Sequence, residues 1–263
     1  MVPKSQKQYL NKGLVSNADQ LEIVFYTDPL CCWSWAFEPQ WRKLRYEFEG
    51  EFSWRYCMGG LIPSWKNFND ITNFVSRPIQ MGPVWMEASH HSGMKIESSI
   101  WAEDPPASSY PACIAVKCAQ LQSAAAGERY LRLLRESIML HGNNISRQEV
   151  LEATAAQLVS EMPSFDVHLF EQDLVNGNGL ALFRNDIHAV QIQNIQRFPA
   201  LLFRRRGYPA VLLTGYKPYP VLLQAFGQVA NDIPKTNTAT KEKYSQYWHS
   251  ATAREVEEIS SEQ

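Results

Sequence analysis

Strand patterns occupy two short and widely separated parts of this sequence. The first part holds Leu21–Tyr26, a β-rich run, and Phe52–Met58, which alternates apolar and polar residues. The second part holds Ala200–Phe203 and Ala210–Leu213, joined by turn residues that are typical of a hairpin. Between them, residues 67–196 show almost no strand signal. Two such halves make one compact α/β structure if their strands share a sheet, so the intervening residues are predicted to form an insertion.

Helical patterns account for most of the remaining chain. Apolar residues three or four apart predict a helix over Trp35–Phe48, and Pro39 predicts a kink or a late start of the regular helix. The further predicted helices are Pro78–His91, Ser108–Ser123, Gly127–His141, a helix from the capping box Ser146–Glu149 to about Ser160, Phe165–Leu174, Asn178–Gln196, Pro218–Val229 and Lys241–Ile259.

The order of these elements predicts the domain organisation. Residues 1–20 are expected to form an N-terminal arm. Residues 21–62 and 197–263 are expected to form one discontinuous α/β domain, and residues 63–196 an inserted helical domain. A chain of 263 residues with 45% hydrophobic residues can bury an ample core without disulfide bonds.

Composition excludes several classes of partner. The chain has 25 Lys and Arg against 27 Asp and Glu, which argues against a broadly basic surface for nucleic acid. No run of residues is long and apolar enough for a membrane helix. Residues 1–20 are polar and lack the apolar core of a secretory signal, so we expect a cytoplasmic protein with free thiols. The five cysteines are Cys31, Cys32, Cys57, Cys113 and Cys118.

Cys31 is the strongest candidate for a reactive group. It lies directly after the first predicted strand and directly before the first helix, where unpaired backbone N–H groups stabilise a thiolate. We therefore expect a lowered pKa for Cys31, whereas Cys32 should turn away with the helix. The alternative is that both cysteines are small apolar residues that fill the corner between strand and helix.

A second feature is Phe198-Pro199, which immediately precedes the strand that begins at Ala200. A proline at the start of a strand can be an ordinary edge residue. It can also have a cis peptide bond, which is uncommon and is usually retained for a reason.

The two features together resemble the thioredoxin superfamily, and the position of the helical insertion resembles its DsbA-like (FrnE-type) branch. The resemblance implies a thioredoxin-like fold with a helical insertion between a β-α-β half and a β-β-α half. It implies that Cys31 is the nucleophile and that Phe198-Pro199 is cis and lies beside its sulfur. Phe198 would then offer backbone groups to a peptide or a glutathione-like ligand, while Cys32 and Trp33 would line the binding site.

The sequence departs from the redox-active members of this branch at one position. They carry Cys-x-x-Cys, whereas this chain has Cys31-Cys32-Trp33-Ser34. A serine hydroxyl cannot attack a mixed disulfide, so Ser34 cannot resolve one. We expect Ser34 instead to donate a hydrogen bond to the Cys31 thiolate.

Three functions agree with these observations. The first is a cytosolic thiol-disulfide oxidoreductase that uses Cys31 alone, with a protein, peptide or small-molecule thiol as partner. The second is a redox-inactive adaptor that binds a peptide or protein. The third is a glutathione-dependent transferase or isomerase of the kappa-class or hydroxychromene carboxylate isomerase type. No bound cofactor or metal is expected, although glutathione or another low-molecular-weight thiol can serve as a co-substrate. The sequence leaves the oligomeric state open.

Overall fold

The computed structural model describes residues 21–237, 240–248 and 250–260. The expected N-terminal arm, residues 1–20, lies outside the described residues. No helix within the described ranges is long and apolar enough to cross a membrane.

The four strands of the described residues form one sheet in the order β2-β1-β3-β4. They are β1 (Glu22–Thr27), β2 (Ser53–Met58), β3 (Ala200–Arg204) and β4 (Val211–Thr214). β1 pairs with β2 in parallel and with β3 antiparallel, and β3 and β4 form the expected antiparallel hairpin. The two halves of the sequence therefore share one sheet, as predicted.

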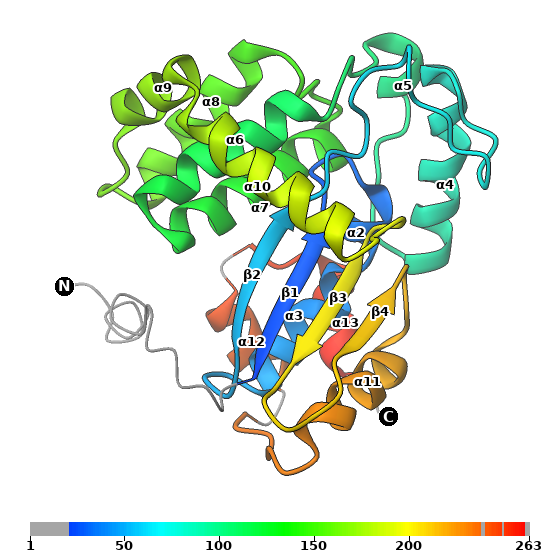
Figure 1. Ribbon diagram of the computed structural model, residues 1–263, viewed down its shortest axis with the longest axis vertical. Helices are drawn as coiled ribbons and strands as arrows, with labels where there is room; N and C mark the ends of the chain where they lie inside the picture. Colours follow the sequence, from blue (N-terminus) through cyan, green and yellow to red (C-terminus); the bar gives the residue numbers. More distant parts are fainter. Residues whose placement is uncertain (1–20, 238–239, 249, 261–263) are drawn as a thin grey trace.

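Helices cover both faces of the sheet, and successive side chains of each strand point to opposite faces. Ile23, Phe25, Leu201 and Phe203 pack with residues of α3 (Glu38–Glu47) and α11 (Tyr219–Ala230). Val24, Tyr26 and Leu202 on the opposite face pack with residues of α10 (Asn178–Ile192). Figure 1 shows α10 crossing in front of the strands, while α3 lies behind them. This is a thioredoxin-like α/β fold with a helical insertion.

The helices between β2 and α10 gather beyond the carboxyl ends of β1 and β2 (Figure 1). They form one apolar core with residues of the first helix after β1. These elements are η1 (Pro78–Gln80), α4 (Met81–Ser92), α5 (Ile100–Glu103), α6 (Tyr110–Gln122), α7 (Ala124–His141), α8 (Gln148–Glu161) and α9 (Val167–Asn176). The last helix of the expected insertion, α10, covers the sheet itself, so the division at residues 62/63 and 196/197 stays a prediction.

The prediction for the first helix is confirmed in its late start, whereas the prediction for the last helix is wrong. The first helix divides at Phe37 into α2 (Cys32–Ala36) and α3, with Pro39 in the first turn of α3, as the late start predicts. The helix expected over 241–259 is instead two helices, α12 (Lys241–Tyr247) and α13 (Ala253–Ser260).

The predicted capping box at the start of α8 is wrong. The residue that precedes this helix is Arg147, and its side chain makes no capping hydrogen bond. The Ser146 hydroxyl donates instead to the side chain of Asn144, at 2.6 Å. Ser146 is one residue too early to cap the helix, and a local turn around Asn144 holds its hydroxyl.

Candidate functional site

Cys31 lies at the amino end of α2, where the sequence places it. Its backbone is extended, and the Ser34 N–H donates to the Cys31 sulfur at 3.3 Å. The thiol is therefore the side-chain cap of α2. This geometry is the one that the strand–helix junction predicts for residue 31.

The direction of the Cys31 pKa shift differs from the prediction. Cys31 is 5% exposed, and burial raises the pKa of its thiol, with only partial opposition from the backbone N–H and the nearby hydroxyl of Ser34. The negative charge of Asp28 raises this pKa further. The expected lowering is therefore wrong: α2 has only five residues, and its few N–H groups do not offset the desolvation of a thiolate.

Ser34 is fully buried beneath the thiol. Its hydroxyl oxygen makes no hydrogen bond to any part of the chain that the structure describes, although it lies close enough to Cys31 to lower the pKa of the thiol. A buried hydroxyl without an acceptor is unusual, because each such group costs free energy. The expected hydrogen bond from Ser34 to a Cys31 thiolate would satisfy it and stays a prediction.

The two residues between Cys31 and Ser34 face different surroundings. Cys32 is 3% exposed and packs in the apolar core with Leu30 and Trp35. Trp33 is half-buried, and its ring centroid lies 6.0 Å from those of His91 and Tyr216. As placed, Trp33 can contact a ligand at the surface, whereas Cys32 faces core residues.

The Trp33, His91 and Tyr216 rings form an aromatic cluster from three separate segments. His91 comes from α4, and Tyr216 follows β4. The His91 and Tyr216 rings meet edge to face at 5.1 Å. No local sequence pattern places His91 or Tyr216 at the site, because these residues lie far from Trp33 and from each other in the chain.

The Phe198-Pro199 peptide bond is cis, which confirms the prediction made from the resemblance. Ala200, the next residue, pairs with Tyr26 near the end of β1, and the Pro199 carbonyl accepts the Gly215 N–H at 2.7 Å. β1 leads from this end of the sheet into the Cys31 loop. The register therefore puts Pro199 and Cys31 at the same end of the sheet, while their direct contact stays a prediction.

Asp28 holds the Cys31 loop to the helical insertion. Its fully buried carboxylate accepts the N–H groups of Leu30 and Leu61 at 2.9 and 2.7 Å. It also accepts hydrogen bonds from the Ser109 hydroxyl at 2.9 Å and the Cys113 thiol at 3.3 Å, both at the start of α6. Burial raises the pKa of Asp28, and these hydrogen bonds oppose the rise. The Asp-Pro pair after the first strand is the only local sequence signal of this role.

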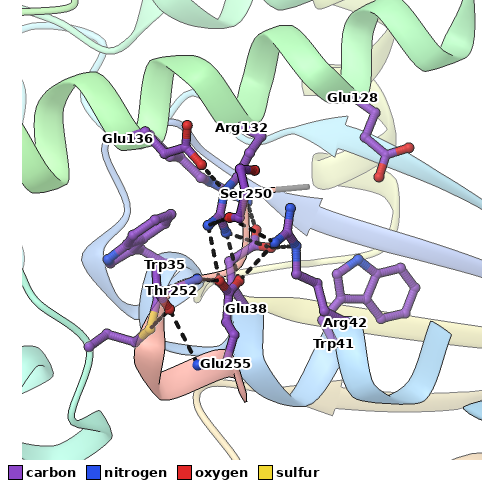
Figure 2. A network of polar contacts seen from close by, with 12 residues as sticks. Trp35, Glu38, Trp41, Arg42, Glu128, Arg132, Glu136, Ser250, Thr252 and Glu255 are labelled. Atoms are coloured by element: carbon purple, nitrogen blue, oxygen red, sulfur yellow. Dashed lines mark hydrogen bonds and ion pairs between the residues drawn. The ribbon is translucent and has the colours of Figure 1, made fainter. Parts of the chain in front are cut away.

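A buried network of charges lies against α2, the helix that Cys31 caps (Figure 2). The Arg132 guanidinium lies 4.5 Å from the Trp35 ring centroid, and Arg135 donates to Glu38 and to Thr27, the last residue of β1. Glu255 of α13 accepts two hydrogen bonds from Arg132, at 2.8 and 3.0 Å. The network therefore joins α7, α3 and the C-terminal helix around the segment that carries Cys31. Sequence patterns could not reveal it, because each helix taken alone shows only ordinary charged residues.

The described residues contain no group of three or more His, Cys, Asp or Glu side chains arranged to hold a metal ion.

Comparison with protein families gives a match over most of the chain. The family model described as Thioredoxin matches residues 24–224. The ClpXP adapter protein SpxH of Halalkalibacterium halodurans is 30% identical over 206 residues, which cover 78% of this chain and 66% of that protein. The chain thus spans slightly less than two thirds of the length of this relative.

Solved structures share the fold at lower identity. A putative protein disulfide isomerase from Nitrosomonas europaea superposes with a TM-score of 0.65 at 18% identity, covering 81% of this chain and 97% of that one. A probable DsbA oxidoreductase from Streptomyces coelicolor superposes with a TM-score of 0.61 at 12% identity, covering 84% and 93%. At these identities the similarities show the fold alone.

Proposed function

Because the chain belongs to the thioredoxin family, in its DsbA-like branch, we propose that it is an adaptor that binds a client protein for a ClpXP-type protease. The client would lie on the surface around Trp33 and Phe198-Pro199. In this proposal the protein uses the fold for recognition and does not exchange disulfides.

The observation that carries the proposal is the state of Cys31. A nucleophilic thiol must be accessible and partly ionised near neutral pH. Cys31 is buried, its pKa is raised, and position 34 holds a serine that cannot release a mixed disulfide. The relative named ClpXP adapter protein SpxH supports the same assignment.

The surface beside Cys31 has features suited to binding a polypeptide. The Trp33, His91 and Tyr216 rings offer a partly exposed aromatic surface, and aromatic residues are the commonest anchors of protein interfaces. Phe198 is half-buried and precedes a buried proline at the start of β3, where a bound segment would pair with the backbone of Phe198.

Turnover of a client tests the adaptor role. Clients are identified as proteins whose half-life lengthens when the gene for this chain is deleted, and their degradation is then reconstituted with purified ClpXP. Cys31→Ser should support degradation as well as the natural chain does, because no sulfur chemistry is required. Trp33→Ser should slow it by about tenfold, because an aromatic anchor is lost. Loss of turnover in Cys31→Ser, or turnover that does not depend on the chain, would overturn the proposal.

A thiol-disulfide oxidoreductase that uses only Cys31 is the second candidate. The observation that favours it is that Ser34 offers two hydrogen-bond donors to Cys31. Its N–H already donates to the Cys31 sulfur, and its hydroxyl has no partner among the described residues. Both groups would stabilise a thiolate once it forms.

Alkylation of the native protein separates the two candidates. We expect Cys31 to react slowly with iodoacetamide at neutral pH, because burial raises the pKa of its thiol, and to react faster only as the pH rises above 9.0, the ordinary pKa of the group. It should still react before the other four cysteines, which are less exposed. Mass-resolved labelling measures each rate, and the unfolded chain, in which all five thiols are accessible, is the control. A Cys31 rate that already reaches its plateau below pH 7 would favour the oxidoreductase.

A further inference from the structure

The segment that follows β2, from its loop into α4, presents apolar side chains to solvent. Ten large apolar residues are exposed within the described part of the chain, and four of them fall within residues 71–86. These four are Ile71, Phe74, Ile79 and Met86, with exposed fractions of 76%, 83%, 56% and 62%. Exposed apolar side chains that gather in one part of a protein often mark an interaction surface.

Residues Asp70–Val75 hold the two most exposed of these side chains in a defined hairpin. Asp70 and Val75 exchange both backbone hydrogen bonds, at 2.8 and 3.0 Å, and the Asp70 carboxylate accepts the N–H of Asn73. Val75 is fully buried in the core of the insertion and anchors the hairpin. Ile71 and Phe74 therefore point outward from a fixed base.

Phe74 adopts a backbone conformation that is unfavourable for its side chain. Its φ angle is 56°, in the left-handed region that glycine and asparagine tolerate and that bulky residues rarely adopt. This backbone conformation costs free energy, yet the Phe74 ring is 83% exposed. Packing of the ring within the described chain does not offset that cost, which points to a contact with a partner.

The hairpin is continuous with the surface that the adaptor proposal uses. The Arg197 guanidinium donates to the Thr72 hydroxyl at 3.2 Å, and Arg197 lies two residues before Pro199. Arg197 and Arg77 are both exposed, and neither forms an ion pair with a carboxylate of the described residues. The apolar tip is thus flanked by two cations that are available to a partner.

We propose that the Asp70–Val75 hairpin is a second contact for the client, which binds an apolar segment flanked by carboxylates. The inference rests on the proposed function, since it extends the client beyond Phe198-Pro199. Ile71 and Phe74 contact the apolar residues of the segment, while Arg77 and Arg197 attract its acidic flanks.

Fluorescence anisotropy with designed peptides tests the proposal. The probe is a labelled peptide with a Leu- and Phe-rich centre and Glu flanks, and two comparison peptides carry Lys flanks or a Ser-rich centre. The natural chain should bind the Glu-flanked apolar peptide and bind both comparison peptides at least about tenfold more weakly. Phe74→Asn should weaken that binding by about tenfold.

Phe74→Asn also distinguishes recognition from a structural role. Asparagine suits the left-handed backbone, so the melting temperature should stay the same or rise while binding is lost. Val175→Asn, at an exposed apolar residue of α9, is the matched control and should leave binding unchanged.

Three results would overturn the inference: no binding by the natural chain, equal binding by Phe74→Asn, or equal binding of the Lys-flanked peptide. The adaptor role fails separately, through the turnover assay and its Trp33→Ser variant. Phe74-dependent peptide binding without client turnover would leave this surface in place and remove only the adaptor role.

Discussion

Replacing Glu255 with glutamine should lower the free energy of unfolding by about 3–5 kcal/mol, the usual effect of breaking a buried ion pair. The Glu255 side chain is fully buried and accepts hydrogen bonds from Arg132 and from the Thr252 N–H at 2.6 Å (Figure 2). It also lies 3.3 Å from the Arg42 guanidinium. Glutamine keeps the shape but leaves two buried cations with less negative charge, and neither can lose its proton. Urea denaturation of both proteins measures the difference.

The same carboxylate predicts how stability depends on acid. Burial alone would raise the pKa of Glu255, but the charges of Arg42 and Arg132 outweigh it and lower the pKa from its ordinary 4.5 to about 2. A pKa that is lower in the folded state gives stability that is present above pH 4.5 and is lost as the pH falls toward 2. The shift corresponds to about 3 kcal/mol. The difference between the natural chain and Glu255→Gln should therefore shrink across this range.

A surface pair provides the control for Glu255. Glu22 and Arg55 lie 3.4 Å apart with about two fifths of each side chain exposed, so Glu22→Gln should cost less than about 1 kcal/mol. In a double-mutant cycle, Arg132→Met should reduce the cost of Glu255→Gln, because the two side chains share one interaction. Equal losses from Glu255→Gln and Glu22→Gln would show that the network contributes no more than a surface pair.

Gly59→Ala should also destabilise the protein, by about 2–3 kcal/mol. The substituted residue lies against Phe198, which belongs to the candidate site. A Cβ atom added to Gly59 would overlap the end of the Phe198 ring. The ring is restrained, because Phe198 is bonded to the buried Pro199, whose carbonyl accepts the Gly215 N–H. The substitution should therefore displace Phe198-Pro199 as well as lower stability. Denaturation measures the first effect, and client turnover at a temperature where the variant is folded measures the second.

Gly227→Ala is the matched control for Gly59→Ala. Gly227 lies inside α11, and an added Cβ would meet no atom within 4 Å. Alanine favours a helix over glycine, so this variant should gain about 0.5–1 kcal/mol. A Gly59→Ala variant that is as stable as the natural chain would mean that Phe198 moves without cost and that Gly59 does not position it.

The sequence was sufficient to predict the sheet. Leu21–Tyr26 and Ala200–Phe203 have strand patterns that depend only on neighbouring residues, and pairing them is the simplest way to bury both. The break before α3 followed from Pro39 for the same local reason. The capping box at Ser146 failed because several local hydrogen bonds compete for one hydroxyl, and the motif does not say which one forms.

At the candidate site, the sequence predicted the position of Cys31 but not the pKa of its thiol. The placement of Cys31 as the cap of α2 and the possibility of a cis bond before Pro199 follow from the order of residues along the chain. The pKa of Cys31 does not, because it depends on how many atoms from distant segments exclude water from the sulfur. The sequence motif, which counts only the nearby N–H groups, therefore predicted the wrong direction.

The sequence by itself determined the fold class, the strand–helix junction that holds Cys31 and Ser34, and the loss of a resolving thiol, because these depend on residue type and neighbouring order. Only the tertiary structure decided the burial of Cys31, the Asp28 connection to Ser109, and the contact of Glu255 with Arg132. Each of these joins residues far apart in the chain. Desolvation and buried charge act through three-dimensional proximity, which a local sequence pattern does not record.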